Sequence, residues 1–268
     1  MEYTFDIIIN TINNYKMINL CVVFLCDKAY FNKFVNTCNQ IITKGKYKGD
    51  ICLVIGDDLL NDNMLDCDII KQNNITIKHF PNITFPKEFL QVNDKINTDG
   101  RNITKKFQWH KLHLFNTFFK NWEYIFYLDC GLTIFSDISP IINQAQEHTL
   151  LAHSDAYPVY EWRLYTQFDK THPMFTALNN RYDLNIDYFQ TTMMLYDTKI
   201  IKEHTFDDLY ALTLEYPISI NNEQGIMALY FTNIEPRFKQ IRTRNENIYF
   251  YDYLKRDSTK EYIMLKMC

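Results

Sequence analysis

Glycine is scarce in this chain, whose 268 residues include only six. Phosphate-binding loops of the GxGxxG and GxxxxGK[ST] types need several glycines, because these let backbone N–H groups approach a phosphate closely. Neither pattern occurs in the sequence. A glycine cradle for phosphate is therefore excluded, and a diphosphate ligand would need cationic side chains or a divalent metal ion to balance its charge.

The sequence also lacks a run of basic residues. Its 28 Lys and Arg against 32 Asp and Glu give a net charge of −4, and the basic residues are spread along the chain. Proteins that bind nucleic acids gather positive charge on one face or in one segment. We therefore expect no nucleic-acid partner.

Long hydrophobic runs and paired cysteines are missing as well. The longest clean apolar run, Leu20–Cys26, is far short of the roughly 20 residues that cross a membrane, and the N-terminus does not have the pattern of a secretion signal. The seven cysteines form an odd set without a CxxC pair, and several lie in apolar segments where a free thiol packs like a small hydrophobe. These features predict a cytoplasmic protein without a membrane span.

A helix, a buried strand and an acidic turn follow one another directly between residues 109 and 143. Residues 124–128 are a continuous apolar run, typical of a parallel strand covered on both faces, and the run ends at Asp129. In open α/β sheets, ligands bind beyond the carboxyl ends of the strands. The turn at residues 129–131 is therefore either a ligand site or an ordinary polar turn, and position alone favours neither.

The segment before this strand places one lysine within an apolar stripe. Phe107, Lys111, Leu114 and Phe118 fall at helical spacing on one face. A lone lysine in such a stripe commonly extends its ammonium past the apolar side chains to water. Alternatively, Lys111 reaches over the strand end toward Asp129 or a bound phosphate.

Two further apolar strands, at residues 20–26 and 51–55, are followed by Asp27 and Asp57. No linker or internal repeat divides the chain, so the sequence predicts one α/β domain over residues 1–268 with a mostly parallel central sheet. We expect residues 1–19 and 254–268 to be peripheral extensions, and residues 80–104 to form a long irregular loop. Asp27, Asp57 and Asp129 are expected at the same edge of the sheet.

His110 and His113 lie three residues apart and would share a helix face. This spacing allows both to bind one metal ion, but no third ligand occurs in register. Positions in the core or at the surface are the more frequent fate of such histidines, and the sequence favours that interpretation.

The order of these motifs resembles the glycogenin-like, family 8-type nucleotide-sugar glycosyltransferases of the GT-A fold. The resemblance is close from Lys111 to Ile142, where KLHLF precedes YIFYLDCGLTIFSDISPI, and the order of elements follows the family over residues 20–231. In that family, a basic helix precedes a strand that ends in an Asp-x-Asp motif. The resemblance implies an α/β GT-A (Rossmann-like) fold. It also implies transfer of a sugar from a nucleoside diphosphate sugar to a hydroxyl acceptor, which is a glycan, a protein or a small molecule.

The resemblance further implies three groups of site residues. Nucleotide binding falls to the end of the first strand and the start of the next helix, here Leu25, Cys26, Asp27 and Tyr30. Tyr30 would either stack on the base or pack in the core. The diphosphate side is matched by Lys111, Asp129 and Gly131, with Gly131 in place of the second Asp. The catalytic residues, on the side of the donor sugar, are matched by Asp155, Gln190, Glu223 and Gln224.

Departures from the family pattern leave the activity open. Gly131 has no carboxylate, Thr191 and Thr192 stand where the family has Ser-Gly, and no histidine follows His204 to match a late metal ligand. The chain is therefore either an active transferase that uses a UDP- or GDP-linked sugar, or a degenerate member that binds a sugar nucleotide or a partner without turnover. Nucleotidyl transfer to a sugar phosphate is less favoured, because a glycine- and arginine-rich entrance is lacking.

The same departures leave two ways to balance the charge of a diphosphate. One is a weak Mn²⁺ or Mg²⁺ site at Asp129, assisted by the nucleotide's own oxygens, which avoids placing a carboxylate beside a diphosphate without a cation. The other is a metal-free site in which Lys111 acts with an arginine such as Arg163, Arg242 or Arg244. The sequence favours the metal.

Overall fold

The computed structural model describes residues 19–96, 106–154, 156–157, 159, 161–245, 248–253 and 259–266, with the backbone alone for 251–253. The strands are β1 (Leu20–Cys26), β2 (Asp50–Ile55), β3 (Thr76–His79), β4 (Tyr124–Asp129), β5 (Leu132–Ile134), β6 (Leu150–Ser154), β7 (Phe189–Asp197), β8 (Phe238–Gln240), β9 (Arg244–Asn245), β10 (Ile248–Tyr253) and β11 (Glu261–Lys266). The α-helices are α2 (Phe31–Thr43), α3 (Asp68–Gln72), α4 (Lys87–Ile96), α6 (Ser139–Ile142), α7 (Met174–Arg181), α8 (Thr205–Glu215) and α9 (Glu223–Leu229). No helix in these ranges is both long and apolar enough to cross a membrane.

Shorter helical segments connect these elements. The 3₁₀ segments are η1 (Lys28–Tyr30), η2 (Asn63–Asp66), η3 (Trp109–Phe115), η4 (Thr117–Asn121), η5 (Leu164–Gln167) and η6 (Thr198–Ile200), and a π-helical turn, η7 (Tyr230–Ile234), follows α9.

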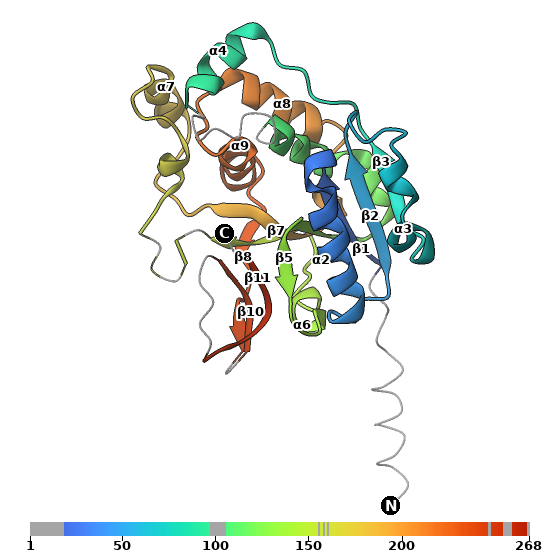
Figure 1. The fold of residues 1–268 in the computed structure, drawn as a ribbon. Helices are drawn as coiled ribbons and strands as arrows, with labels where there is room; N and C mark the ends of the chain where they lie inside the picture. The colour runs from blue at the N-terminus through green and yellow to red at the C-terminus, as the bar shows by residue number, and fades with distance from the viewer. Residues whose placement is uncertain are drawn as a thin grey trace, which may run out of the picture.

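The described residues form two sheets, as Figure 1 shows. The central sheet has seven strands in the order β3-β2-β1-β4-β7-β6-β8, and a second sheet has the order β5-β11-β10-β9. Strands β3, β2, β1 and β4 are parallel, whereas β7 runs antiparallel to both β4 and β6. The predicted α/β architecture with a mostly parallel central sheet is confirmed.

The strand order reverses between β1 and β4. From β1 the chain moves to β2 and then β3 on one side, and it later returns to place β4 on the other side. Ligands of open α/β sheets bind beyond the carboxyl ends of the strands at such a reversal. Because β1, β2 and β4 are parallel, Asp27, Asp57 and Asp129 lie at this same edge, as the sequence predicts.

Two hydrophobic cores cover the two faces of the central sheet. Along β1, Val23 faces one core and Val22 faces the other, so the strand is buried on both sides. The first core contains residues from α8, α9 and η3, and Figure 1 shows α8 and α9 together on one side of the sheet. The second core contains residues from α2, α3, α6 and the second sheet. Burial on both faces explains why the strands are continuous apolar runs rather than alternating ones.

The segment predicted as one helix, residues 107–118, winds mainly as η3 and η4. Asn116 separates them with an extended backbone (φ −74°, ψ 147°), and its side-chain Oδ1 accepts a hydrogen bond from the N–H of Phe118 at 2.9 Å. The asparagine side chain gives this N–H an acceptor other than a helical carbonyl oxygen, so the helix ends here. The loop predicted at 80–104 contains α4, while its residues 97–104 lie outside the described part of the chain.

Strand β11 differs from the peripheral extension expected at residues 254–268. It lies between β5 and β10, parallel to β10 and antiparallel to β5, and its residues 262–265 are buried. Lys266 pairs in register with Leu132, directly after Gly131. Residues 254–258 and 267–268, and the expected N-terminal extension up to residue 18, lie outside the described residues.

Candidate functional site

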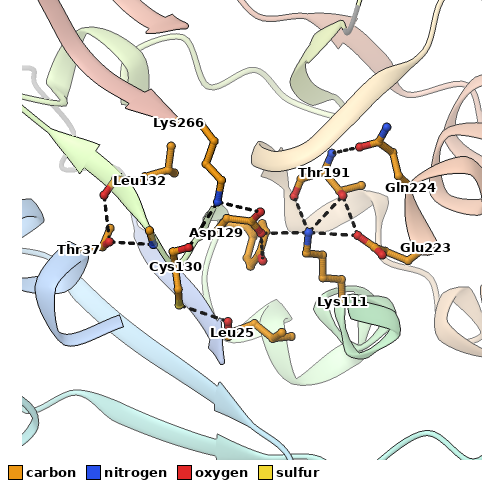
Figure 2. Close-up of polar contacts among 12 residues, drawn as sticks. Leu25, Thr37, Lys111, Asp129, Cys130, Leu132, Thr191, Glu223, Gln224 and Lys266 are labelled. Atoms are coloured by element: carbon orange, nitrogen blue, oxygen red, sulfur yellow. Dashed lines mark hydrogen bonds and ion pairs between the residues drawn. The ribbon is translucent and has the colours of Figure 1, made fainter. Parts of the chain in front are cut away.

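Residues 129–131 form a tight turn between β4 and β5, held against α2. Gly131 has φ +95°, a left-handed backbone conformation that residues with a Cβ rarely adopt. Its N–H donates to Thr37 Oγ1 at 3.0 Å, and Thr37 in turn donates to the carbonyl of Leu132 at 3.0 Å. The turn is thereby fixed, and the Asp129 side chain projects at the strand end (Figure 2).

The ammonium of Lys111 lies between two carboxylates. It is 3.0 Å from Asp129 Oδ1 and 3.1 Å from Glu223 Oε1. It also donates to the carbonyl oxygen of Thr191 at 3.3 Å and to its Oγ1 at 3.2 Å. Only 8% of the lysine side chain is exposed. Of the two arrangements that the sequence allowed, the lysine turns inward to Asp129, as Figure 2 shows.

Glu223 begins α9 and is tied to the start of β7. Thr191 Oγ1 donates to Glu223 Oε1 at 2.8 Å, and the N–H of Thr191 donates to Gln224 Oε1 at 3.3 Å. Glu223 Oε2 is buried and has no hydrogen-bond partner among the described residues. An unpartnered buried oxygen costs free energy, which makes this atom a candidate contact for a polar group of a ligand or a water molecule.

The three charged groups have pKa values shifted in different directions. Burial alone would raise the pKa of Asp129, but Lys111 and Lys266 hold it below its ordinary value. For Glu223, burial outweighs Lys111 and raises the pKa above the ordinary value. Burial alone would lower the pKa of Lys111, and the two carboxylates raise it instead. Asp129 is therefore ionised, whereas Glu223 is the carboxyl closer to neutrality, and opposed shifts of this kind are typical of functional sites.

A second lysine reaches Asp129 from β11, and sequence reasoning missed it. Lys266 Nζ is 3.7 Å from Asp129 Oδ2 and donates to the carbonyl of Cys130 at 3.4 Å. Tyr127 OH completes the surroundings of the carboxylate by donating to Asp129 Oδ1 at 2.6 Å. The available sequence signal was the short apolar run at residues 262–265, directly before this lysine. Such a run is typical of a buried strand with a charged residue at its end.

The residues predicted to bind the nucleotide gather at the carboxyl end of β1. Leu25 is buried and in register with the last residue of β4, and Cys26 is buried beside it. Asp27 Oδ1 accepts a hydrogen bond from the N–H of Tyr30 at 2.9 Å, which caps η1, and burial raises the pKa of this carboxyl. Tyr30 is half-buried, with Lys33 Nζ 4.3 Å from the centroid of its ring. The structure thus places these residues beside the acidic turn.

The remaining predicted residues are distributed differently. Gln190 is buried in β7, next to the threonine that contacts Lys111, whereas Asp155 lies outside the described residues. Of the arginines considered for the diphosphate, Arg242 lies over the Phe250 ring at 5.5 Å from its centroid, and Arg244 is exposed in β9. The additional cation at Asp129 is a lysine instead.

His110 and His113 are core residues. The His113 ring stacks between Phe80 and Phe206, with centroid separations of 4.5 Å on each side. The His110 ring stacks on Phe107 at 4.7 Å. No group of three His, Cys, Asp or Glu side chains that could hold a metal ion occurs in the part of the chain that the structure describes.

We expect these two histidines to make the free energy of unfolding fall in mild acid. Burial lowers the pKa of His110 from 6.5 to about 4 and that of His113 from 6.5 to about 3. Between those values and 6.5, the unfolded chain binds protons that the folded chain does not, so stability is lost as pH falls through this window. The loss approaches roughly 1.4 kcal/mol per pH unit for each histidine. Urea unfolding at a series of pH values measures it.

A His113→Phe variant supplies the control for this pH dependence. A phenyl ring fits between Phe80 and Phe206, so the stack is kept while one titrating group is lost. Below pH 6.5, we expect the fall in the free energy of unfolding that the two histidines cause to be about half as large in the variant as in the parent. Only His110 then remains to bind a proton on unfolding. Equal pH slopes in the variant and the parent would show that the histidine is not buried in its neutral form.

Comparison with known proteins gave matches to solved structures alone. No family model and no curated protein matches the chain. The galactosyltransferase LgtC, solved with donor and acceptor sugar analogs, matches at 12% identity over 92% of this chain and 87% of its own, with a TM-score of 0.57. The Saccharomyces cerevisiae mannosyltransferase Ktr4p, in complex with GDP, matches at 11% identity over 84% and 69%, with a TM-score of 0.51. Core-mannan synthase A of Aspergillus fumigatus, in its Mn/GDP form, matches at 10% identity over 85% and 73%, with a TM-score of 0.50.

Identities this low establish a shared fold. The matched proteins are glycosyltransferases, and the similarity extends over most of the described strands and helices. The mixed, mostly parallel central sheet matches theirs in architecture. This chain therefore has the GT-A fold of glycosyltransferases such as LgtC and the Ktr mannosyltransferases.

Proposed function

We propose that the chain transfers a sugar from a UDP- or GDP-linked donor to a hydroxyl acceptor. The observation that carries this proposal is the buried Lys111 cluster, in which one ammonium joins two carboxylates at the strand reversal of a GT-A fold. Buried charges with opposed pKa shifts in one place are more typical of a working site than of a structural core. The finding that LgtC was solved with donor and acceptor analogs, and Ktr4p with GDP, supports the same chemistry.

The proposed site divides the donor among three groups of residues. The nucleotide lies at the end of β1, against Leu25, Cys26, Asp27 and Tyr30. The diphosphate lies over Asp129 and Gly131, with Lys111 below the carboxylate. The sugar and acceptor lie toward Gln190, Glu223 and Gln224, and Asp155, which the resemblance adds to this group, lies outside the described residues. Negative charge develops on the departing diphosphate in the transition state, and fixed cations beside it stabilise that charge.

The side chains around Asp129 do not fit the divalent metal ion that the sequence favoured. Mg²⁺ and Mn²⁺ take about six oxygen ligands, usually with more than one carboxylate or phosphate. Gly131 supplies no carboxylate, and Glu223 Oε1 is engaged by Lys111 and Thr191. The Asp129 carboxylate itself already accepts contacts from Tyr127 and two lysines.

A protein that binds a sugar nucleotide without turnover is the second candidate. The observation in its favour is the saturation of Lys111. An ammonium has three N–H donors, and this one already faces four oxygen atoms at 3.0 to 3.3 Å. Lys111 has no donor left for a phosphate while the cluster is intact.

We expect sugar nucleotides to stabilise the folded chain and to be hydrolysed slowly without an acceptor. A ligand at a hundred times its Kd adds about 2.7 kcal/mol to the free energy of unfolding, which a thermal-shift screen detects. The screen compares uridine and guanosine diphosphate sugars with the nucleosides alone. Calorimetry then gives Kd, and release of free nucleoside diphosphate from the donor measures hydrolysis.

The outcomes of this screen separate the two candidates. Hydrolysis or transfer of a bound donor supports the transferase. Binding without hydrolysis, and without transfer to any of a panel of glycan, peptide and small-molecule acceptors, supports the non-catalytic protein. The absence of any response to nucleotides would refute both.

A further inference from the structure

The carboxylate of Asp129 lies between two ammonium groups that differ in accessibility. Lys111 contacts Oδ1 at 3.0 Å and is 8% exposed, whereas Lys266 approaches Oδ2 at 3.7 Å and is 21% exposed. The contact of Lys266 with the carbonyl of Cys130 is also long, at 3.4 Å. Hydrogen bonds to charged groups are strongest below about 3 Å, so Lys266 keeps donor capacity that Lys111 has used. Figure 2 shows the two lysines on opposite sides of Asp129.

A third lysine lies beside the turn. A Cβ built on Gly131 would be 3.5 Å from Lys33 Cδ and 3.9 Å from Lys266 Nζ. Lys33 comes from α2 and is exposed, whereas Lys266 comes from β11. The side chains of two lysines therefore flank the position at which an Asp-x-Asp motif would carry its second carboxylate, Lys266 through its ammonium and Lys33 through its Cδ, with the Lys33 ammonium over the Tyr30 ring.

Lysine side chains outnumber carboxylates in the cluster around Asp129, to which Asp27 at the end of β1 is a neighbour and not a contact. Among the described side chains, the ammonium groups of Lys111 and Lys266 contact the carboxylate of Asp129, Lys111 also contacts Glu223, and the Lys33 side chain passes beside Gly131. The raised pKa of Glu223 moves the balance further toward positive charge. Two ammonium groups next to the Asp129 carboxylate disfavour a divalent cation at that carboxylate and favour a diphosphate beside it.

We propose that the site binds the diphosphate of its donor through a lysine clamp, Lys266 with Lys33, and needs no divalent metal ion. Lys111 fixes the orientation of Asp129, and Asp129 holds Lys266 over the turn, so that the Lys266 ammonium can move from a weak contact onto a phosphate oxygen. This inference rests on the proposed function, because it concerns the same donor site.

The test is calorimetric binding of uridine diphosphate and guanosine diphosphate, in EDTA and then in excess Mn²⁺. We expect the better of the two to bind in EDTA, with a Kd that Mn²⁺ changes by less than about threefold, since no protein ligand set draws the ion to the turn. Lys266→Ala is expected to weaken the diphosphate about tenfold or more, the effect of losing one charge-assisted contact. It should weaken the corresponding nucleoside much less, because the nucleoside carries no phosphate.

Two further variants separate this role from a structural one. Lys266→Arg keeps the charge and is expected to retain most of the affinity for the diphosphate. Lys199→Ala removes an exposed lysine that pairs with Glu147 on the surface, and should bind as the parent does. If Lys266→Ala does not fold, Lys33→Ala, on the exposed face of α2, tests the clamp in its place.

Each unfavourable result has a distinct meaning. Binding that appears only with Mn²⁺, or unchanged diphosphate affinity in both Lys266→Ala and Lys33→Ala, overturns the lysine clamp and leaves the proposed function in place. Failure of both diphosphates to bind, with and without Mn²⁺, overturns the proposed function and the clamp together.

Discussion

A Lys111→Met variant is expected to lose about 3–5 kcal/mol of its free energy of unfolding, together with any donor-dependent activity, because two buried carboxylates lose their shared cation. Asp129 and Glu223 lie 3.0 and 3.1 Å from this ammonium. Methionine has a similar length and fills a similar volume, so the loss reports charge rather than packing. Urea unfolding near neutral pH measures it, and an unchanged m-value shows that the denatured state is comparable.

Two control variants define the source of this loss. Lys111→Met combined with Glu223→Gln removes one of the two carboxylates that Lys111→Met leaves buried without a cation. In a double-mutant cycle, the combined variant is expected to recover part of the lost free energy of unfolding. Lys199→Met removes an exposed lysine and should change the free energy of unfolding by less than about 1 kcal/mol. A Lys111→Met variant as stable as Lys199→Met would contradict a buried, interdependent cluster.

A Glu223→Gln variant is expected to lower turnover about 100-fold or more while leaving the affinity for the nucleoside diphosphate within about threefold. Glu223 Oε2 is buried and has no hydrogen-bond partner in the described part of the chain, and we place the sugar and acceptor on this side of Lys111. A glutamine oxygen can still accept from Lys111 and Thr191, so the neighbouring contacts persist. The measurement pairs kcat for donor hydrolysis with calorimetric Kd.

The stability of the same variant distinguishes a chemical role from a structural one. Burial raises the pKa of Glu223, so the folded chain holds its proton to higher pH than the unfolded chain does. Its contribution to stability is therefore lost as pH rises from the unfolded-state pKa toward the folded one. A neutral glutamine avoids the cost of burying an ionised carboxylate at this position, and the variant should be at least as stable as the parent at pH 7. Unchanged kcat in such a stable variant would rule out a role in turnover, with Glu215→Gln, on the exposed face of α8, as the matched control.

Strands β1 and β4, between which the strand order reverses, could be predicted because the apolar pattern that identifies each lies within its own residues. Residues 20–26 and 124–128 are apolar throughout, which is the pattern of strands buried on both faces, and each is followed or ended by an acidic residue. Parallel pairing then places Asp27 and Asp129 at one edge without knowledge of the side-chain packing. The reach of Lys111 toward Asp129 was one of two alternatives, because the choice between water and a carboxylate depends on burial that spacing does not show.

The second cation could not be predicted, because its position depends on a non-local pairing. Lys266 reaches Asp129 because β11 pairs between β5 and β10. Nothing in the run at 262–265 identifies its partner strand. The segment containing Lys111 was also read as a regular helix, whereas Asn116 divides it through a side-chain hydrogen bond that competes with the helical one.

The left-handed conformation of Gly131 constrains how such a site could change during evolution. A Cβ at this position would meet no atom closer than 3.5 Å, so space is not the obstacle to an aspartate. The obstacle is the backbone, since φ +95° is strained for any residue other than glycine. A carboxylate at position 131 would therefore require a rebuilt turn, and it would face Lys266 until that lysine was also replaced. A lysine-based and a metal-based version of this site are thus separated by several concerted substitutions, and single steps from one toward the other are disfavoured.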